Sequence, residues 1–121
     1  MSKKQYIVLA KKTTQMTRDE IIDYLNIEEP VLFLDPPEVY DKGILGISED
    51  HCHLIYGYWA LVTALAEDYE KEWVKNGSEG EKPDFYNDAM EWIDYNTIRS
   101  LPYYSNENCP IVIYELPGGE K

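Results

Sequence analysis

The run Glu49–His53 (EDHCH) holds residue types that bind transition metals. If the run lies in a strand, alternation places His51 and His53 on the same side, where two imidazoles could converge on one ion. A third ligand, Cys109 or an acid, would have to come from elsewhere in the chain. The alternative, which we expect, is a hairpin loop with Cys52 packed inward and no metal bound.

The rest of the sequence does not mark a catalytic centre. Neighbouring residues on a strand face opposite ways, so Cys52 and its histidine neighbours do not make a pair of nucleophile and base. Carboxylates are too numerous for a pair such as Glu67 and Glu91 to indicate general acid–base catalysis. Gly118 and Gly119 follow the last expected strand and do not make a phosphate loop. We therefore expect a protein that is not an enzyme and has no cofactor.

Acidity is the strongest feature of the composition. The 121 residues include 23 Asp and Glu against 11 Lys and Arg, a net charge of -12. Binding to DNA, RNA or an anionic membrane needs clustered basic residues, so the charge argues against all three and allows a basic protein partner. The longest apolar run is far shorter than the roughly 20 residues of a membrane span.

The start of the sequence bears on the compartment. The run MSKKQYIVLAKK lacks the apolar stretch and cleavage site of a signal peptide. We therefore expect a cytoplasmic protein whose Cys52 and Cys109 are reduced thiols, with one or both packed in the core.

The charges are distributed unevenly along the chain. Residues 1–18 carry five basic and no acidic groups, residues 19–50 have a net charge of -9, and residues 67–94 have a net charge of -7. On a helix, Asp84, Asp88 and Glu91 would form a row with a spacing of about 5–6 Å. Such rows on a rigid protein could occupy the basic groove of a nucleic-acid-binding protein in place of DNA. The alternative is a solvated face that only keeps the protein soluble.

Tyrosine is unusually common, with 11 Tyr and 3 Trp against 2 Phe. A tyrosine can bury its ring at a wet interface while its hydroxyl stays hydrogen bonded, so exposed tyrosines among acids would suit a partner rich in Arg. We expect core positions for Tyr69, Tyr86 and Tyr114. The tyrosines expected beside loops, helix ends or polar faces, where binding is more plausible, are Tyr40, Tyr58, Tyr95, Tyr103 and Tyr104.

The elements that would position these residues follow from the hydrophobic pattern. The runs 43–48 and 53–58 predict a hairpin, and period-3.6 spacing predicts a long helix from Trp59 to the Asn76-Gly77 stop. A second helix is expected from its cap Asp84 to Leu101, with Pro102 closing it and Asp84, Asp88, Glu91 and Tyr95 facing outward. Its expected inner face is Tyr86, Ala89, Met90, Ile93, Thr97, Ile98 and Leu101.

The remaining segments complete the expected fold. Residues 5–10 read as a first strand, Thr17 and Glu20 as the capping box of a short helix, and residues 110–116 as a buried last strand. Residues 31–34 are either a strand or an apolar anchor, because two prolines follow them. The predicted class is α+β in one domain, residues 1–121. It has a small, mainly antiparallel sheet of three to five strands, two long helices packed on one face and a short N-terminal helix.

One stretch resembles a known group of proteins. The run AMEWIDYNTIRSLPYYSNENCPIVIYEL (89–116), together with GILGISED and HLIYGY upstream, resembles a widespread and largely uncharacterised group of small acidic proteins of Firmicutes and their phages and mobile elements. The resemblance runs from Gly43 onward. It departs in the hairpin turn, where the group's pattern has a short Asp-Gly turn, and in the longer loop after Trp73. The motif residues are Trp92, Asp94, Tyr95, Asn96, Thr97, Arg99 and Pro102.

These motif residues also have a structural explanation. Asp94 and Asn96 could bond the backbone near the helix end, and Arg99 could pair with Asp94 or Asp35. The chain is similar in kind, though not by aligned motif, to anti-CRISPR and anti-restriction inhibitors, several of which imitate DNA.

Charge and resemblance together predict a non-catalytic binding protein that inhibits a CRISPR nuclease or another nucleic-acid-binding defence enzyme by occupying its basic surface. The alternative is a small accessory protein with a ligand or metal site near the 49–53 turn, whose acids serve only solubility. The expected partner-binding residues are Asp84, Asp88, Glu91 and Tyr95 on one helix, Glu67, Asp68, Glu70 and Glu72 on the other, and Asp35, Glu38, Asp41, Glu49 and Asp50 in the loops.

Overall fold

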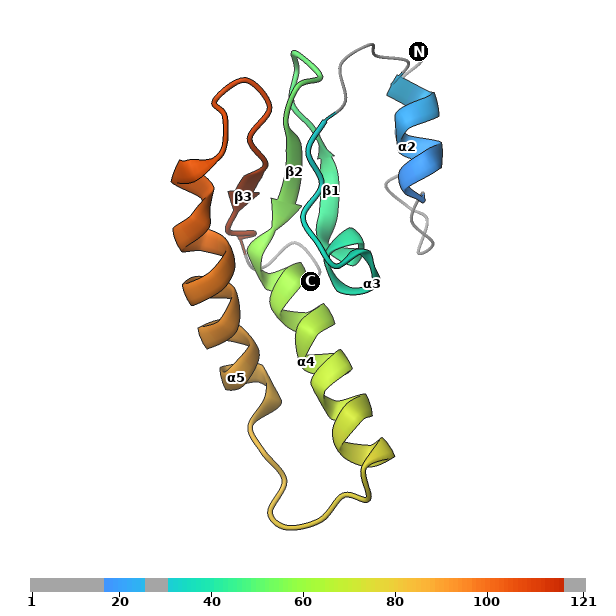
Figure 1. Cartoon of the computed structure of the whole chain (residues 1–121), viewed down its shortest axis with the longest axis vertical. Coiled ribbons are helices and arrows are strands. Elements are labelled where there is room, and N and C mark those ends of the chain that lie inside the picture. The colour runs from blue at the N-terminus through green and yellow to red at the C-terminus, as the bar shows by residue number, and fades with distance from the viewer. Residues whose placement is uncertain (1–16, 26–30, 117–121) are drawn as a thin grey trace.

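The computed structural model describes residues 17–25 and 31–116 (Figure 1). The predicted first strand, residues 5–10, lies outside them. The elements are α2 (Arg18–Leu25), α3 (Pro37–Tyr40), a 3-10 turn (Asp41–Gly43), β1 (Ile44–Ile47), β2 (Leu54–Gly57), α4 (Tyr58–Lys75), α5 (Phe85–Trp92), a π turn (Ile93–Thr97), a 3-10 segment (Ile98–Tyr103) and β3 (Ile111–Ile113). The α+β class is confirmed.

The described strands form one mixed sheet in the order β1-β2-β3. β1 and β2 make the predicted antiparallel hairpin, whereas β3 lies parallel to β2, with Tyr56 opposite Val112. The parallel pairing follows from the path of the chain (Figure 1). α4 continues in the direction of β2 and α5 returns, so the chain re-enters the sheet in the same direction as β2.

The last strand differs from the prediction of a buried strand over residues 110–116. It has only three residues, and Ile111 and Ile113 are 38% and 42% exposed. Because side chains alternate along a strand, Val112 packs against the core beside Tyr56 and its two neighbours face outward.

The core lies between the inner face of the sheet, α4 and α5. Its fully buried side chains include Tyr56, Leu61, Val62 and Ile93. Residues 31–34 form no strand. They act as the apolar anchor of the alternative interpretation, because Val31 and Leu34 are buried and the Leu34 amide donates to the Tyr56 hydroxyl at 2.8 Å.

Two helix starts are as predicted. At α2, the Thr17 and Glu20 side chains accept from each other's backbone amides at 3.1 and 2.9 Å, which is the reciprocal capping box. At α5, the Asp84 carboxylate accepts from the Asn87 amide at 3.1 Å. The short helix α3 was not predicted, although Pro37 at its first turn is a common helix starter.

The end of the second helical segment differs from the prediction. The helix was expected to end before Pro102, but it continues through the π turn and a 3-10 segment that includes Pro102. Pro is tolerated there because a short 3-10 segment loses little when one amide is missing. Within the π turn, Thr97 is buried and its hydroxyl is hydrogen bonded to that of Tyr40.

The start of α4 is capped by a residue far away in the sequence. Glu115, just after β3, accepts from the amides of Trp59 and Ala60 at 2.8 and 3.1 Å. Gly57 makes room for this carboxylate, because a Cβ at that position would lie 2.1 Å from Glu115 Oε2. The carboxylate thus ties the last strand to the positive end of the α4 dipole.

We expect Glu115→Gln to lower the free energy of unfolding by about 1 kcal/mol, because one of the two accepting oxygens becomes an NH2 group, which cannot accept, and the negative charge is lost. Urea denaturation followed by circular dichroism measures the change. Glu107→Gln is the control, since it removes one exposed acid whose side chain makes no described contact. Equal stabilities of the two variants would contradict the assigned role of Glu115.

Candidate functional site

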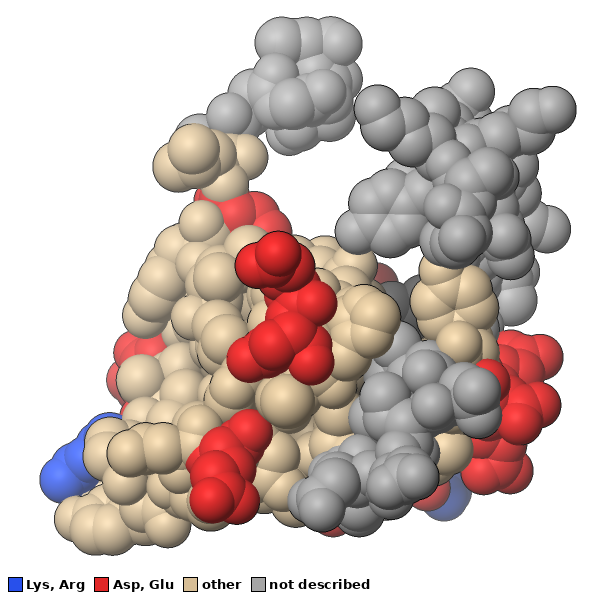
Figure 2. Space-filling view, turned by 90° about the horizontal axis from the view of Figure 1, so that it is seen from above, with Lys and Arg blue, Asp and Glu red and all other residues tan. Residues whose placement is uncertain are grey.

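The predicted binding residues fall into three groups. One lies on α4 and α5, one surrounds α3 (Asp35, Glu38 and Asp41), and one is the hairpin turn (Glu49 and Asp50). The hairpin turn and the loop between α4 and α5 lie at opposite ends of the molecule (Figure 1). Figure 2, seen from the hairpin end, shows acidic side chains in separate groups with other residues between them. The predicted residues therefore do not share one surface.

The group around α3 is largely used within the protein. Arg18 Nε donates to both carboxylate oxygens of Asp41 at 2.9 and 3.0 Å, and Arg18 Nη2 lies 3.0 Å from Asp35 Oδ1. The same nitrogen donates to the Leu34 carbonyl at 2.7 Å, and the guanidinium lies over the Phe33 ring. These contacts attach α2 to the domain and pair the single positive charge of Arg18 with two acidic side chains.

The suggested pairing of Arg99 with Asp94 or Asp35 is wrong. Arg99 forms no ion pair within the described ranges, and its guanidinium carbon lies 4.6 Å from the centre of the Tyr95 ring. Asp94 instead accepts from the Tyr58 hydroxyl at 2.8 Å. Asn96 does bond the backbone, as expected, by donating to the Trp92 carbonyl at 3.1 Å.

The hairpin turn is held by Asp50. Its carboxylate accepts from the Ser48 hydroxyl at 2.5 Å and from the Cys52 amide at 3.0 Å, and these hydrogen bonds lower the pKa of Asp50. His51 adopts a left-handed conformation, with φ 64°, so strand alternation does not relate it to His53. His53 Nδ1 lies 2.8 Å from the Cys109 carbonyl oxygen.

The turn does not assemble a set of metal ligands. Over residues 17–25 and 31–116, no three residues among His, Cys, Asp and Glu are placed to hold a metal ion. Cys52 is exposed, so its expected inward packing is wrong, and Cys109 is half-buried. The two thiols are not joined in a disulfide.

α4 and α5 lie side by side and antiparallel, with Trp73 packed edge-to-face on Phe85 (Figure 1). All the predicted acids on these helices are exposed, as is Tyr95 at 68%. Glu70 pairs with Lys82 at 3.3 Å. The acids that form no ion pair with any described Lys or Arg are Glu67, Asp68, Glu72, Asp84, Asp88 and Glu91.

The acids of the two helices meet around Tyr69. Burial of this side chain raises its pKa, and the nearby carboxylates of Asp88 on α5 and Asp68 on α4 raise it further. One carboxylate from each helix is therefore close enough in space to act on the same hydroxyl. This supports one acidic surface across α4 and α5.

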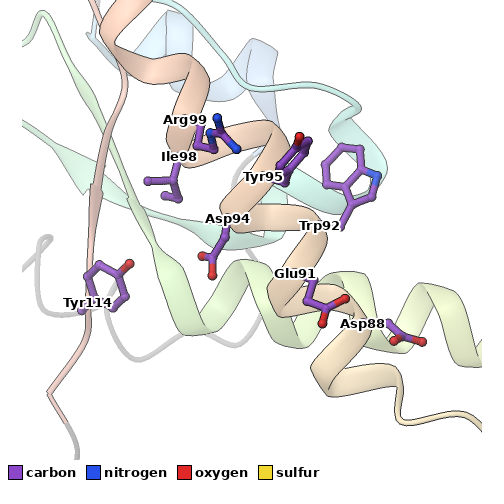
Figure 3. A pocket seen from close by; sticks show the side chains of 8 residues that line it. All are labelled: Asp88, Glu91, Trp92, Asp94, Tyr95, Ile98, Arg99 and Tyr114. Carbon is purple, nitrogen blue, oxygen red and sulfur yellow. The ribbon is translucent and has the colours of Figure 1, made fainter.

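An open hollow of about 850 Å³ runs along α5 and its continuation (Figure 3). It contains the predicted residues Asp88, Glu91 and Tyr95. The lining residues that were not among the predicted binding residues are Trp92, Asp94, Ile98, Arg99 and Tyr114. Helical spacing could have found Trp92 and Arg99, which lie four residues after Asp88 and Tyr95. Tyr114 could not be found this way, because β3 brings it to the hollow.

Tyr69 packs against the core and Tyr95 and Tyr103 are exposed, as expected, but four other tyrosines are placed opposite to the prediction. Tyr40 and Tyr58, expected near the surface, are each 2% exposed, whereas Tyr86 and Tyr114, expected in the core, are 44% and 57% exposed. Burial of Tyr58 and its hydrogen bond to Asp94 raise its pKa well above the ordinary value. Tyr114 stacks on the buried Tyr58 ring with centroids 4.5 Å apart.

The exposed rings form a cluster next to the hollow, which we call the aromatic cluster and define as Trp59, Tyr86 and Tyr114. The ring of Trp59 is nearly parallel to that of Tyr86, at 6.5 Å between centroids, and lies 6.4 Å from that of Tyr114. Large aromatic side chains held rigidly at a surface are typical anchors of protein–protein interfaces.

Within the described residues, no helix is both long and apolar enough to cross a membrane. Compared with protein-family models, with curated proteins and with solved structures, the chain has no match.

Proposed function

We propose that this protein is a non-catalytic binding protein whose α4 and α5 face occupies a basic nucleic-acid-binding surface of another protein. A CRISPR nuclease or another nucleic-acid-binding defence enzyme is the kind of partner that the proposal names. The observation that carries it is the set of exposed carboxylates on α4 and α5 that form no ion pair with a described Lys or Arg.

The arrangement of these groups supports binding to a protein. Carboxylates on a rigid helix pair keep their spacing, so a partner's basic groove can meet them without ordering a flexible chain. The aromatic cluster borders the same helices and adds area that can be desolvated. Charge then provides fast association and selectivity, and the rings provide a buried centre.

The other two acidic groups support the proposal less. Asp35 and Asp41 are held by Arg18, and Asp50 is held by its turn. A partner that bound them would compete with contacts that stabilise the fold. We therefore centre the proposed interface on α4 and α5.

The test is a set of charge reversals with a matched control. One variant carries Asp68→Lys, Asp88→Lys and Glu91→Lys, and the control carries Glu38→Lys, Glu49→Lys and Glu107→Lys. All six residues are exposed, and both variants have the same net charge. Tagged proteins are used to capture partners from a bacterial lysate at low salt, and duplex DNA is then added as a competitor.

We expect the wild-type protein and the control to retain a nucleic-acid-binding enzyme that DNA or high salt displaces. The α4 and α5 variant should bind that enzyme roughly 100-fold more weakly, since six units of charge change at about 0.5 kcal/mol each. Equal loss in both variants, or a partner that DNA does not displace, would overturn the proposal and leave the acids as a solvated surface.

A further inference from the structure

The hollow on α5 combines unneutralised carboxylates with aromatic rings. Asp88 and Glu91 form no ion pair with a described basic residue, and the only described hydrogen bond to either side chain is a long one, 3.5 Å, from Asn87 to Glu91. Trp92, which is 40% exposed, lies one residue beyond Glu91 and four beyond Asp88. Residues three and four apart on a helix are neighbours, so Asp88 adjoins both Glu91 and Trp92, and all three side chains line the hollow.

One ring of the hollow already accepts a guanidinium. Arg99 lies over Tyr95, and Figure 3 shows Arg99, Tyr95 and Trp92 in succession, with Glu91 and Asp88 beyond them. No described cation lies over the Trp92 ring, although indole is the aromatic group that attracts cations most strongly. The Trp92 ring therefore offers a cation the same kind of aromatic surface as the Tyr95 ring, and two carboxylates, Asp88 and Glu91, line the hollow with it.

We infer that this part of the hollow binds an arginine side chain of a basic partner, with the guanidinium on the Trp92 ring and its N–H groups directed to Asp88 and Glu91. This inference rests on the proposed function, since it gives the chemistry by which a basic partner would be recognised. Arginine suits the position better than lysine. Its planar guanidinium stacks on a ring, donates in a fixed fork to carboxylates, and loses less hydration than an ammonium group.

The segment of α5 and the π turn that carries Trp92 is held in place by the core. Trp92 ends α5 and its ring meets the buried Tyr40 ring edge-on, with centroids 6.4 Å apart. The hydroxyl of the same Tyr40 is hydrogen bonded to that of the buried Thr97, which fixes the π turn that follows α5. One buried tyrosine therefore contacts both the last residue of α5 and the last residue of the π turn, within the segment that lines the hollow.

The test uses two blocked peptides, Gly-Arg-Gly-Arg-Gly and Gly-Lys-Gly-Lys-Gly, titrated into the full chain labelled with nitrogen-15. We expect the arginine peptide to bind about 5-fold more tightly than the lysine peptide, and to shift the Trp92 indole signal and the amides of residues 88–99. Trp92→Leu should remove the preference for arginine. Trp73→Leu, the same change at a half-buried tryptophan that does not line the hollow, should keep it.

Equal affinities for the two peptides, or shifts confined to other surfaces, would overturn the inference. Retained preference for arginine in Trp92→Leu would do so as well. Failure of this inference is distinguishable from failure of the proposed function. Equal peptide affinities alongside a DNA-displaced partner would reject only the arginine position. An arginine preference centred on Trp92, without such a partner, would reject only the proposed function.

Discussion

Leu61→Ala is expected to lower the free energy of unfolding by about 3 kcal/mol, because it removes a fully buried side chain of α4 and leaves a cavity. Gly43, at the end of the 3-10 turn before β1, faces this side chain. A Cβ at Gly43 would lie 2.5 Å from Leu61 Cδ2 and 2.9 Å from Leu61 Cγ. Gly43→Ala alone should therefore also destabilise the fold, by about 1–3 kcal/mol, through overpacking.

The double variant distinguishes this specific contact from two unrelated defects. With Leu61 shortened, the new methyl group at Gly43 enters the cavity and no longer clashes. We expect the double variant to be more stable than the sum of the two single changes predicts, by at least about 1 kcal/mol. Urea denaturation of the four proteins completes the cycle. Additivity within about 0.5 kcal/mol would show that the two positions do not share the space.

Arg18→Ala is expected to open α2 locally. The side chain bonds Asp41, Asp35 and the Leu34 carbonyl and covers the Phe33 ring, whereas most of α2 is exposed. Loss of these contacts should cost about 2 kcal/mol and raise amide hydrogen exchange in residues 21–25 roughly 30-fold. Exchange in the core of α4 should change much less, because α4 does not depend on this attachment.

Lys42→Ala is the matched control, since it removes one positive charge next to Asp41 from an exposed side chain with no described partner. Arg18→Lys is informative as well. A lysine keeps the charge, but its single nitrogen cannot replace both Nε, which bonds Asp41, and Nη2, which contacts Asp35 and the Leu34 carbonyl, so exchange in α2 should remain fast. If Arg18→Lys protects α2 as well as arginine does, the attachment depends on charge and not on the guanidinium fork.

Elements specified by neighbouring residues could be predicted from the sequence. The hairpin, the long helix after it and the caps at Thr17 and Asp84 depend on residues a few positions apart, which interact in any fold. Periodicity likewise placed Asp84, Asp88, Glu91 and Tyr95 on the outer side of α5, its N-cap and the π turn that continues it. These are the parts of the candidate site that a helix alone determines.

Features that depend on contacts between distant segments could not be predicted. β3 pairs parallel to β2 because α4 and α5, which lie between the two strands in the chain, return it to the end of the sheet where β2 begins. Tyr114 is exposed because β3 ends just before it. The attachment of Arg18 to Asp35 and Asp41 requires a turn of the chain at two prolines. A tyrosine has no single preferred environment, so only the fold could separate Tyr58 from Tyr86.

The carboxylate of Glu115 has a consequence for how the protein emerges from the ribosome. It reaches the amide of Trp59 across 56 residues of sequence, and β3 pairs with β2 over a similar separation. The hairpin and most of α4 can form as soon as they are synthesised, because their contacts are local. The first turn of α4 stays uncapped, and one edge of β2 unpaired, until residues 111–115 have been translated. During that interval the nascent chain has an open strand edge, which is the part of the fold most exposed to pairing with another chain.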